Sequence, residues 1–284
     1  MESDPQGRQL VMSCGAALNH LDVALRGAGI LGRIERFPMD GTPAPLAIVT
    51  VQRGHRVDSD DEALLAAIAE RRSDRRPFKP ADLEAFVPLI LLGIDALGIA
   101  GTVLTDGSRD AVASASLMTA AVHRYDSVNH HEIHWWAGHD RASDGIPRTL
   151  LGDAATASAV VGRNFPIGSL KPSGPLADAA DWLLLYAAED SPRSWLHAGE
   201  ALSSVLLRAT ASGFATCTVS HVFQDAESRE LLRQSLPPTA RVDAVPQVLV
   251  RIGAAESSPL TTSSPRRTLQ DVMDTTSVPQ GDRR

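Results

Sequence analysis

The chain has 284 residues, of which 43% are hydrophobic and 21% charged, and its formal net charge at pH 7 is −7. This is the composition of a globular protein that is long enough for one large domain or two small ones. The acidic balance argues against a nucleic-acid-coating protein, which needs a broad positive face. The sequence begins without a signal-peptide pattern, and Pro88 and Asp95 interrupt its most apolar stretch. We therefore expect a cytoplasmic protein that neither spans a membrane nor binds nucleic acid.

Residues 14–29 are predicted to form the first helix. Leu18, Leu21 and Leu25 recur on one face of it, and the glycine that closes the segment is typical of a helix C-cap. The segment 198–213 has the same pattern and aligns with 14–29 without gaps, at an offset of 184 positions. Both segments are therefore predicted to be helices of the same kind.

A second pair of segments follows these two helices. The strand predicted at 45–51 resembles the one predicted at 246–252, because both begin with proline and are rich in β-branched residues. Each half of the chain thus carries a helix, a glycine, a strand-like segment, a loop and a Pro-led strand. The order indicates an internal duplication, and chance similarity between two helical patterns is the alternative.

The remaining elements are predicted from periodicity, caps and breakers. They are a helix from about Asp60 to Arg72 that Pro77 ends, a strand at 100–105, a helix capped by Asp106 and running to about Val122, a helix at 127–138, a loop at 164–176, and a buried strand at 181–189. The polar tail after Asp274 is predicted to be disordered.

A dense group of cations follows the helix that is predicted from Asp60. The stretch RRSDRRPFK contains Arg71, Arg72, Arg75, Arg76 and Lys79, with Asp74 as its only acid. Residues four apart share a helix face, which would pair Arg71 with Arg75. The pattern fits a solvated helix C-terminus, where cations favour the helix dipole. It also fits a site for a phosphate-like anion, to which Ser73 would add a hydroxyl donor.

Two further patterns carry candidate ligands. Arg266 and Arg267 follow a loop rich in serine, threonine and proline, and they are either the start of an ordinary loop or part of an anion site. His130 and His134 have metal-ligand spacing on a helix, but the fuller His-Glu-x-x-His pattern is absent, so no metal site is predicted.

Several stretches, taken in order, resemble one known family. AIAERRSDRRPF, SGFATCTV and VRIGAAESSPLTTSSPRRTLQDV are similar to three motifs of the FMN-dependent nitroreductases. NHHEIHWWAGHDRASDGIPRTLLG, WLHAGEALSSVLLRAT and FATCTVSH look like the Acg-type branch of actinobacteria, in which two such halves are fused. The resemblance implies an α+β fold of the nitroreductase type, with a mixed, mostly antiparallel sheet flanked by helices.

The same resemblance implies a set of cofactor-binding residues. Arg71, Ser73 and Arg75 would bind the 5′-phosphate of FMN, with Arg72 beside them. Arg266 or Arg267 would contact the same phosphate from the C-terminal stretch. Ser220 and His221 would lie at the flavin ring, although His221 also fits an ordinary loop histidine. Because the cofactor carries the redox chemistry, no catalytic protein residue is predicted.

The chain departs from the family in its first half. The flavin-facing segment of the family, Ala-Pro-Ser-x-x-Asn-x-Gln-Pro-Trp, is absent. We expect a truncated first half at 1–58 and a second half at 59–274, with a possible lid at about 123–150 that includes Trp135 and Trp136. Residues 275–284 would be a tail. A true start on the order of fifty residues upstream and a degenerate protein are the two explanations that we consider.

The functional expectation is an FMN-binding, NAD(P)H-dependent oxidoreductase that acts on a nitro or quinone-type acceptor. One alternative is a non-catalytic protein that sequesters flavin under a lid, and another is a remnant that binds no flavin. The fused design favours a monomeric pseudo-dimer, while an exposed apolar surface would favour a weak homodimer.

Overall fold

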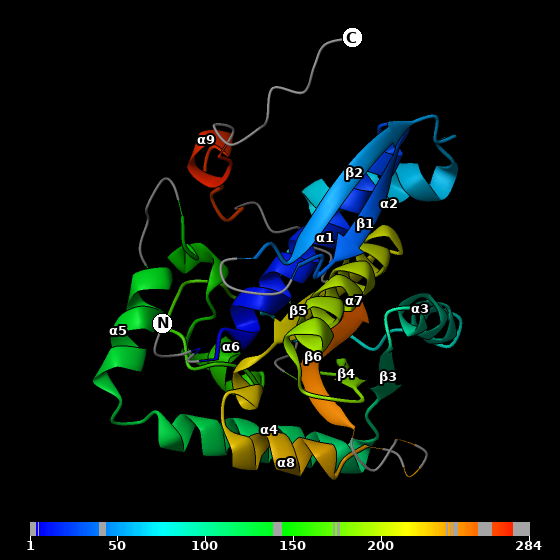
Figure 1. Ribbon diagram of the computed structural model, residues 1–284. Coiled ribbons are helices and arrows are strands. Elements are labelled where there is room, and N and C mark those ends of the chain that lie inside the picture. Colours follow the sequence, from blue (N-terminus) through cyan, green and yellow to red (C-terminus); the bar gives the residue numbers. More distant parts are fainter. Residues whose placement is uncertain are drawn as a thin grey trace.

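The structure is a computed structural model of the chain (Figure 1). It describes residues 4, 6–39, 44–138, 144–172, 174, 177–236, 238, 240, 244–254 and 263–274. The α-helices within this part are α1 (Arg8–Gly27), α2 (Ser59–Glu70), α3 (Phe86–Asp95), α4 (Asp106–Val122), α5 (Ser127–Trp136), α6 (Ala154–Ala159), α7 (Pro192–Ala211), α8 (Ala226–Arg233) and α9 (Leu269–Val272). The strands and short 3₁₀ turns are β1 (Ile30–Arg36), β2 (Ala47–Arg53), β3 (Ile99–Val103), β4 (Asp181–Ala187), β5 (Phe214–Val219), β6 (Val245–Ala254), η1 (Arg148–Leu150) and η2 (His221–Phe223).

The larger sheet has the strand order β3-β4-β6-β5, and every neighbouring pair in it is antiparallel. Side chains alternate across β4, as the period of two in a strand requires. Leu183 and Leu185 pack into the core cluster that contains residues of α3 and α7. Trp182 and Leu184 pack into the cluster that contains residues of α4, α8 and η2. Helices therefore cover both faces of this sheet, as the α+β prediction requires.

Helices α1 and α7 cross in close contact at the centre of the molecule (Figure 1). A Cβ atom added to Gly15 would lie 2.0 Å from the Leu196 carbonyl oxygen, and one added to Gly199 would lie 1.9 Å from the Met12 carbonyl oxygen. These contacts are reciprocal at the same offset. Gly15 lies 184 positions before Gly199, and Met12 lies 184 positions before Leu196. Reciprocal contacts between matched residues are typical of an isologous interface, in which a two-fold axis relates the two sides.

The antiparallel strand pairs β1–β2 and β5–β6 repeat the same pairing register. Each follows a glycine with positive φ, Gly29 at 74° and Gly213 at 80°, a region that favours glycine. In the first pair, Gly32 lies opposite Val51. In the second, Thr216 lies opposite Ile252. Val51 and Ile252 are the residues that the sequence alignment matched. The division into two halves stays a prediction, and the shared register and the reciprocal glycines support it.

Most predicted elements are confirmed, with two corrections. The helix predicted to run to Arg72 ends at Glu70, and Arg71 is already extended, with φ −56° and ψ 126°. The helix that follows β3 has Thr105 rather than Asp106 at its N-cap. The predicted tail at 275–284 lies outside the described residues. Within the described part of the chain, no helix is both long and apolar enough to cross a membrane.

Candidate functional site

The cation-rich stretch is extended rather than helical, so the prediction that Arg71 and Arg75 share a helix face is wrong. Ser73 forms a parallel bridge with Thr216 of β5, and the Asp74 N–H donates to the Thr216 carbonyl oxygen at 2.9 Å. Alternate side chains of an extended segment point the same way. Alternation from the Ser73 bridge therefore predicts that Arg71, Ser73 and Arg75 lie on one side of the segment. The three residues that the family resemblance selects would then be grouped by a strand period instead of a helix period.

The single acid of the stretch is neutralised by its own neighbour. Asp74 and Arg76 are both buried, and Asp74 Oδ2 lies 2.6 Å from Arg76 Nη2. The Arg76 Nε also donates to Asp74 Oδ1 at 3.0 Å. The charge of Asp74 is thus satisfied by Arg76. The guanidinium groups on the opposite side of the segment gain no counter-ion from it.

Three of the remaining arginines form a positive cluster. The pKa of Arg71 is lowered, first by burial and then by the positive charges of Arg266 and Arg72. Within the described part of the chain, no carboxylate forms an ion pair with Arg71, Arg72 or Arg266. Like charges that repel one another without a counter-ion would be stabilised by an anion. The fold therefore brings Arg266, one member of the C-terminal basic pair, near Arg71, and the role of these residues in phosphate binding stays a prediction.

Arg75 links this stretch to a cavity of about 580 Å³. Its guanidinium lies over the ring of Phe165, 5.1 Å from the ring centroid. The wall includes Ser220 and His221, together with residues 160–167 and the end of β5. This volume lies within the range of small-molecule sites. Arg75, Ser220 and His221 thus line one cavity, and their role in flavin binding stays a prediction.

His221 is a buried, neutral imidazole in this wall. Its Nε2 lies 2.9 Å from the Ser116 hydroxyl, which itself donates to the Gly162 carbonyl oxygen at 3.3 Å. Burial, and after it the positive charges of Arg163 and His123, lowers the pKa of His221 from 6.5 to about 3. Because the hydroxyl hydrogen of Ser116 is used by Gly162, we assign the proton to Nε2. The Nδ1 atom is then left as an acceptor.

The depressed pKa of His221 predicts a pH-dependent stability. The unfolded chain takes up this proton near pH 6.5 and the folded chain only near pH 3, so the stabilisation is complete above pH 6.5 and is lost as the pH falls. Between pH 6 and 5, we expect the free energy of unfolding of the wild type to fall by about 1.2 kcal/mol more than that of His221→Gln. Urea unfolding of both proteins at each pH measures this difference. Equal pH slopes would contradict the assignment.

The second member of the C-terminal basic pair lies elsewhere. Arg267 Nη2 is 3.1 Å from Asp144 Oδ2, and its guanidinium lies 6.0 Å from the ring centroid of Trp136 at the end of α5. Asp144 and Trp136 both belong to the segment predicted as a lid. A smaller cavity, lined by residues of α4 and α5, shares His221 with the larger one. The contacts of Arg267 therefore connect the predicted lid segment to the C-terminal stretch, while Arg266 lies near Arg71.

Sequence reasoning missed two arginines of the cavity wall. Arg251 on β6 is fully buried, pairs with Asp178 at 2.8 Å and lies over the Phe78 ring at 4.5 Å. The single charged residue in the strand VPQVLVRIGA was the signal that could have found it. Arg163 also lines the cavity, but its loop carries no comparable pattern.

The structure also describes most of the histidines considered as metal ligands, and both cysteines. Within the described residues, no group of three His, Cys, Asp or Glu side chains could hold a metal ion, and His139 lies outside them. His130 lies on the wall of the smaller cavity. Cys14 and Cys217 are free thiols.

Relatives in Mycobacterium tuberculosis identify the family. A protein named "Putative NAD(P)H nitroreductase acg" is 35% identical over 95% of this chain and 82% of its own length. The chain belongs to the Acg-type nitroreductase family. A second relative with the same description is 32% identical over 96% of this chain and 79% of its own length. The predicted family and the nitroreductase type of the fold are thereby confirmed.

Solved structures of nitroreductases are more distant from this Acg-type chain. The FMN and NADPH-dependent nitroreductase NfnB from a Sphigopyxis strain is 22% identical, with a TM-score of 0.45 over 74% of this chain and 97% of that one. A nitroreductase with bound FMN from Desulfitobacterium hafniense is 15% identical, with a TM-score of 0.47 over 75% and 97%. No protein-family model matches the chain.

Proposed function

We propose that this protein is an FMN-binding, NAD(P)H-dependent oxidoreductase that reduces a nitro or quinone-type acceptor. The observation that carries the proposal is the cluster of Arg71, Arg72 and Arg266, which has no carboxylate partner in the described chain and lies at the end of the Arg71–Arg75 segment. A phosphate monoester carries nearly two negative charges and accepts several hydrogen bonds, so it fits this donor set. The names of the mycobacterial relatives point to the same activity.

The residues of the site divide into two roles. Arg71, Ser73 and Arg75 would hold the phosphate of FMN from one side of the extended segment, and Arg72 and Arg266 would add positive charge. Bound FMN supplies the hydride and electron transfer. Ser220 and His221 would line the space for the flavin ring in the 580 Å³ cavity. His221, neutral at physiological pH, would offer its Nδ1 lone pair there without adding charge.

A second candidate function is flavin sequestration without turnover. The contacts of Arg267 with Asp144 and Trp136 favour it, because they fasten the predicted lid segment to the C-terminal stretch that carries Arg266. A fastened lid would retain flavin and restrict the approach of NAD(P)H or an acceptor. The cytoplasmic location, the monomeric state and the absence of nucleic-acid partners remain predictions.

The visible absorption spectrum and the oxidation of NADH and NADPH test both candidates. We expect the purified chain to bind added FMN and to oxidise NAD(P)H in the presence of nitrofurazone or menadione. FMN binding without oxidation of either reductant would favour sequestration. A chain that binds no FMN would contradict both functions and leave the remnant interpretation.

A further inference from the structure

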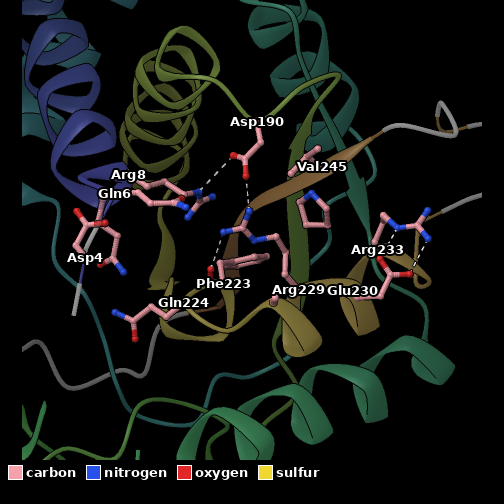
Figure 2. Close-up of a pocket in the computed structure, with 13 residues that line it drawn as sticks. Asp4, Gln6, Arg8, Asp190, Phe223, Gln224, Arg229, Glu230, Arg233 and Val245 are labelled. Atoms are coloured by element: carbon pink, nitrogen blue, oxygen red, sulfur yellow. Dashed lines mark hydrogen bonds and ion pairs between the residues drawn. The ribbon is translucent and has the colours of Figure 1, made fainter. Parts of the chain in front are cut away.

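A second charged pocket, of about 360 Å³, lies apart from the cavity described above (Figure 2). It opens between the start of α1, the turn η2 and helix α8. Arg8 enters it from the first residue of α1, and Arg229 enters it from α8. Phe223 of η2 and Val245 and Pro246 of β6 give it an apolar wall. Arg233 and Glu230 also line the pocket and pair with each other at 2.6 Å, which leaves Arg8 and Arg229 as the two guanidinium groups beside Asp190.

The two arginines share one carboxylate. Asp190 accepts from Arg229 Nη1, and its Oδ1 lies 4.0 Å from Arg8 Nε, beyond hydrogen-bond distance. Asp190 also accepts from the Trp195 indole N–H. The second acid near Arg8, Asp4, accepts from the Leu10 N–H at 2.9 Å. Both acids are therefore already engaged by other donors.

Each arginine keeps an unused donor. Arg8 is only 4% exposed, and it donates Nη2 to the backbone and side-chain oxygens of Gln247. Its Nε is buried and has no hydrogen-bond acceptor. Arg229 uses Nη1 for Asp190 and Nη2 for the Phe223 carbonyl oxygen, and its buried Nε also lacks an acceptor. A buried donor without an acceptor is costly, so a ligand oxygen that reached it would be stabilised.

The lowered pKa of Arg8 is consistent with its unpaired Nε donor. Its pKa is lowered to about 10, chiefly by burial and next by the charge of Arg229, and the nearby aspartates only partly oppose these effects. The charged form of Arg8 is thus less well solvated here than in water. An additional negative group would compensate for this loss.

We propose that this pocket binds a small organic oxyanion, a phosphomonoester or carboxylate, whose oxygens accept from Arg8 and Arg229 while its apolar part lies against Val245, the half-buried residue of the apolar wall. Guanidinium forks suit both oxyanions. The volume exceeds that of a bare oxyanion and lies at the small end of ligand sites. This site is distinct from the Arg71 cluster and does not depend on flavin binding.

Phenyl phosphate is the probe that tests the proposal. It is titrated by calorimetry into the full chain carrying Arg71→Met, which weakens the other phosphate-binding cluster. We expect saturable binding that Arg229→Gln weakens about tenfold, the loss of one charge-assisted hydrogen bond. Arg33→Gln removes the same charge from the exposed face of β1 and should leave the affinity unchanged.

A conservative variant separates binding from folding. Arg229→Lys keeps a cation for Asp190 but removes the Nε donor, so it should fold as the parent does and still bind the probe more weakly. The proposal is overturned by an absence of saturable binding in the Arg71→Met chain. It is equally overturned if Arg229→Gln and Arg229→Lys bind as tightly as the Arg33→Gln control.

Discussion

Replacing Arg71 by Met is expected to weaken FMN binding by about 10- to 100-fold, which corresponds to the loss of hydrogen bonds to a charged group. Arg71 is the most constrained member of the cluster, because burial and the neighbouring Arg266 and Arg72 all disfavour its charge when no anion is present. The same repulsion means that the folded protein without FMN should lose no stability in the variant. Fluorescence quenching of FMN on titration with protein measures the affinity.

The matched control for this experiment is Arg33→Met on the exposed face of β1, which removes one positive charge elsewhere. FMN affinity should be unchanged in it. If both variants bound FMN equally well, the Arg71 cluster would not be the phosphate site. If both lost affinity alike, only the overall charge of the protein would matter.

Replacing Gly199 by Ala is expected to destabilise the fold by about 3 kcal/mol or more, even though alanine is the better helix former. The added Cβ would lie 1.9 Å from the Met12 carbonyl oxygen, a backbone atom that can retreat only if α1 moves away from α7. Gly15→Ala should have a similar effect, because its Cβ would meet the Leu196 carbonyl oxygen at 2.0 Å. Urea unfolding monitored by circular dichroism measures both losses.

Gly93 provides the control for helix propensity. It lies inside α3, and a Cβ added there would have no heavy atom within 4 Å. Gly93→Ala should therefore stabilise the protein by about 0.5–1 kcal/mol, the usual gain in a helix interior. A similar gain in Gly199→Ala would show that α1 and α7 do not cross as closely as the structure describes.

The reciprocal crossing also bears on the proposed duplication. Asn19 and Ser203 occupy matched positions in the two helices, and the Ser203 hydroxyl donates to Asn19 Oδ1 at 2.8 Å. A contact between matched residues is expected on the axis of a two-fold interface. The contacts of the crossing therefore support the predicted division into two halves, which stays a prediction.

Local patterns in the sequence determined most of the secondary structure. The apolar stripe of Leu18, Leu21 and Leu25 and the glycines that follow α1 and α7 specify elements through contacts within a few residues. The ungapped alignment of 14–29 with 198–213 also paired the two helices, α1 and α7, that cross at the centre of the fold. These features could be predicted because each depends on the chain's own periodicity.

The conformation of the cation-rich stretch was decided by tertiary contacts. Helical periodicity favoured Arg71 and Arg75 on one helix face, but pairing of Ser73 with Thr216 of β5 extends the segment. No local pattern could reveal this, since the partner lies 143 positions away in the sequence. The group of residues proposed for the phosphate survives the correction, because a spacing of two in a strand also aligns Arg71, Ser73 and Arg75.

The amino-acid sequence alone indicates the family, the order of elements and the residue types that can bind an anion. Which of these charged side chains lack a counter-ion follows from the folded arrangement. Asp74 forms an ion pair with Arg76, and Asp144 forms one with Arg267. The buried Nε of Arg8 has no hydrogen-bond acceptor. Ion pairing depends on distances of a few ångströms between residues from distant parts of the chain, and folding alone sets those distances.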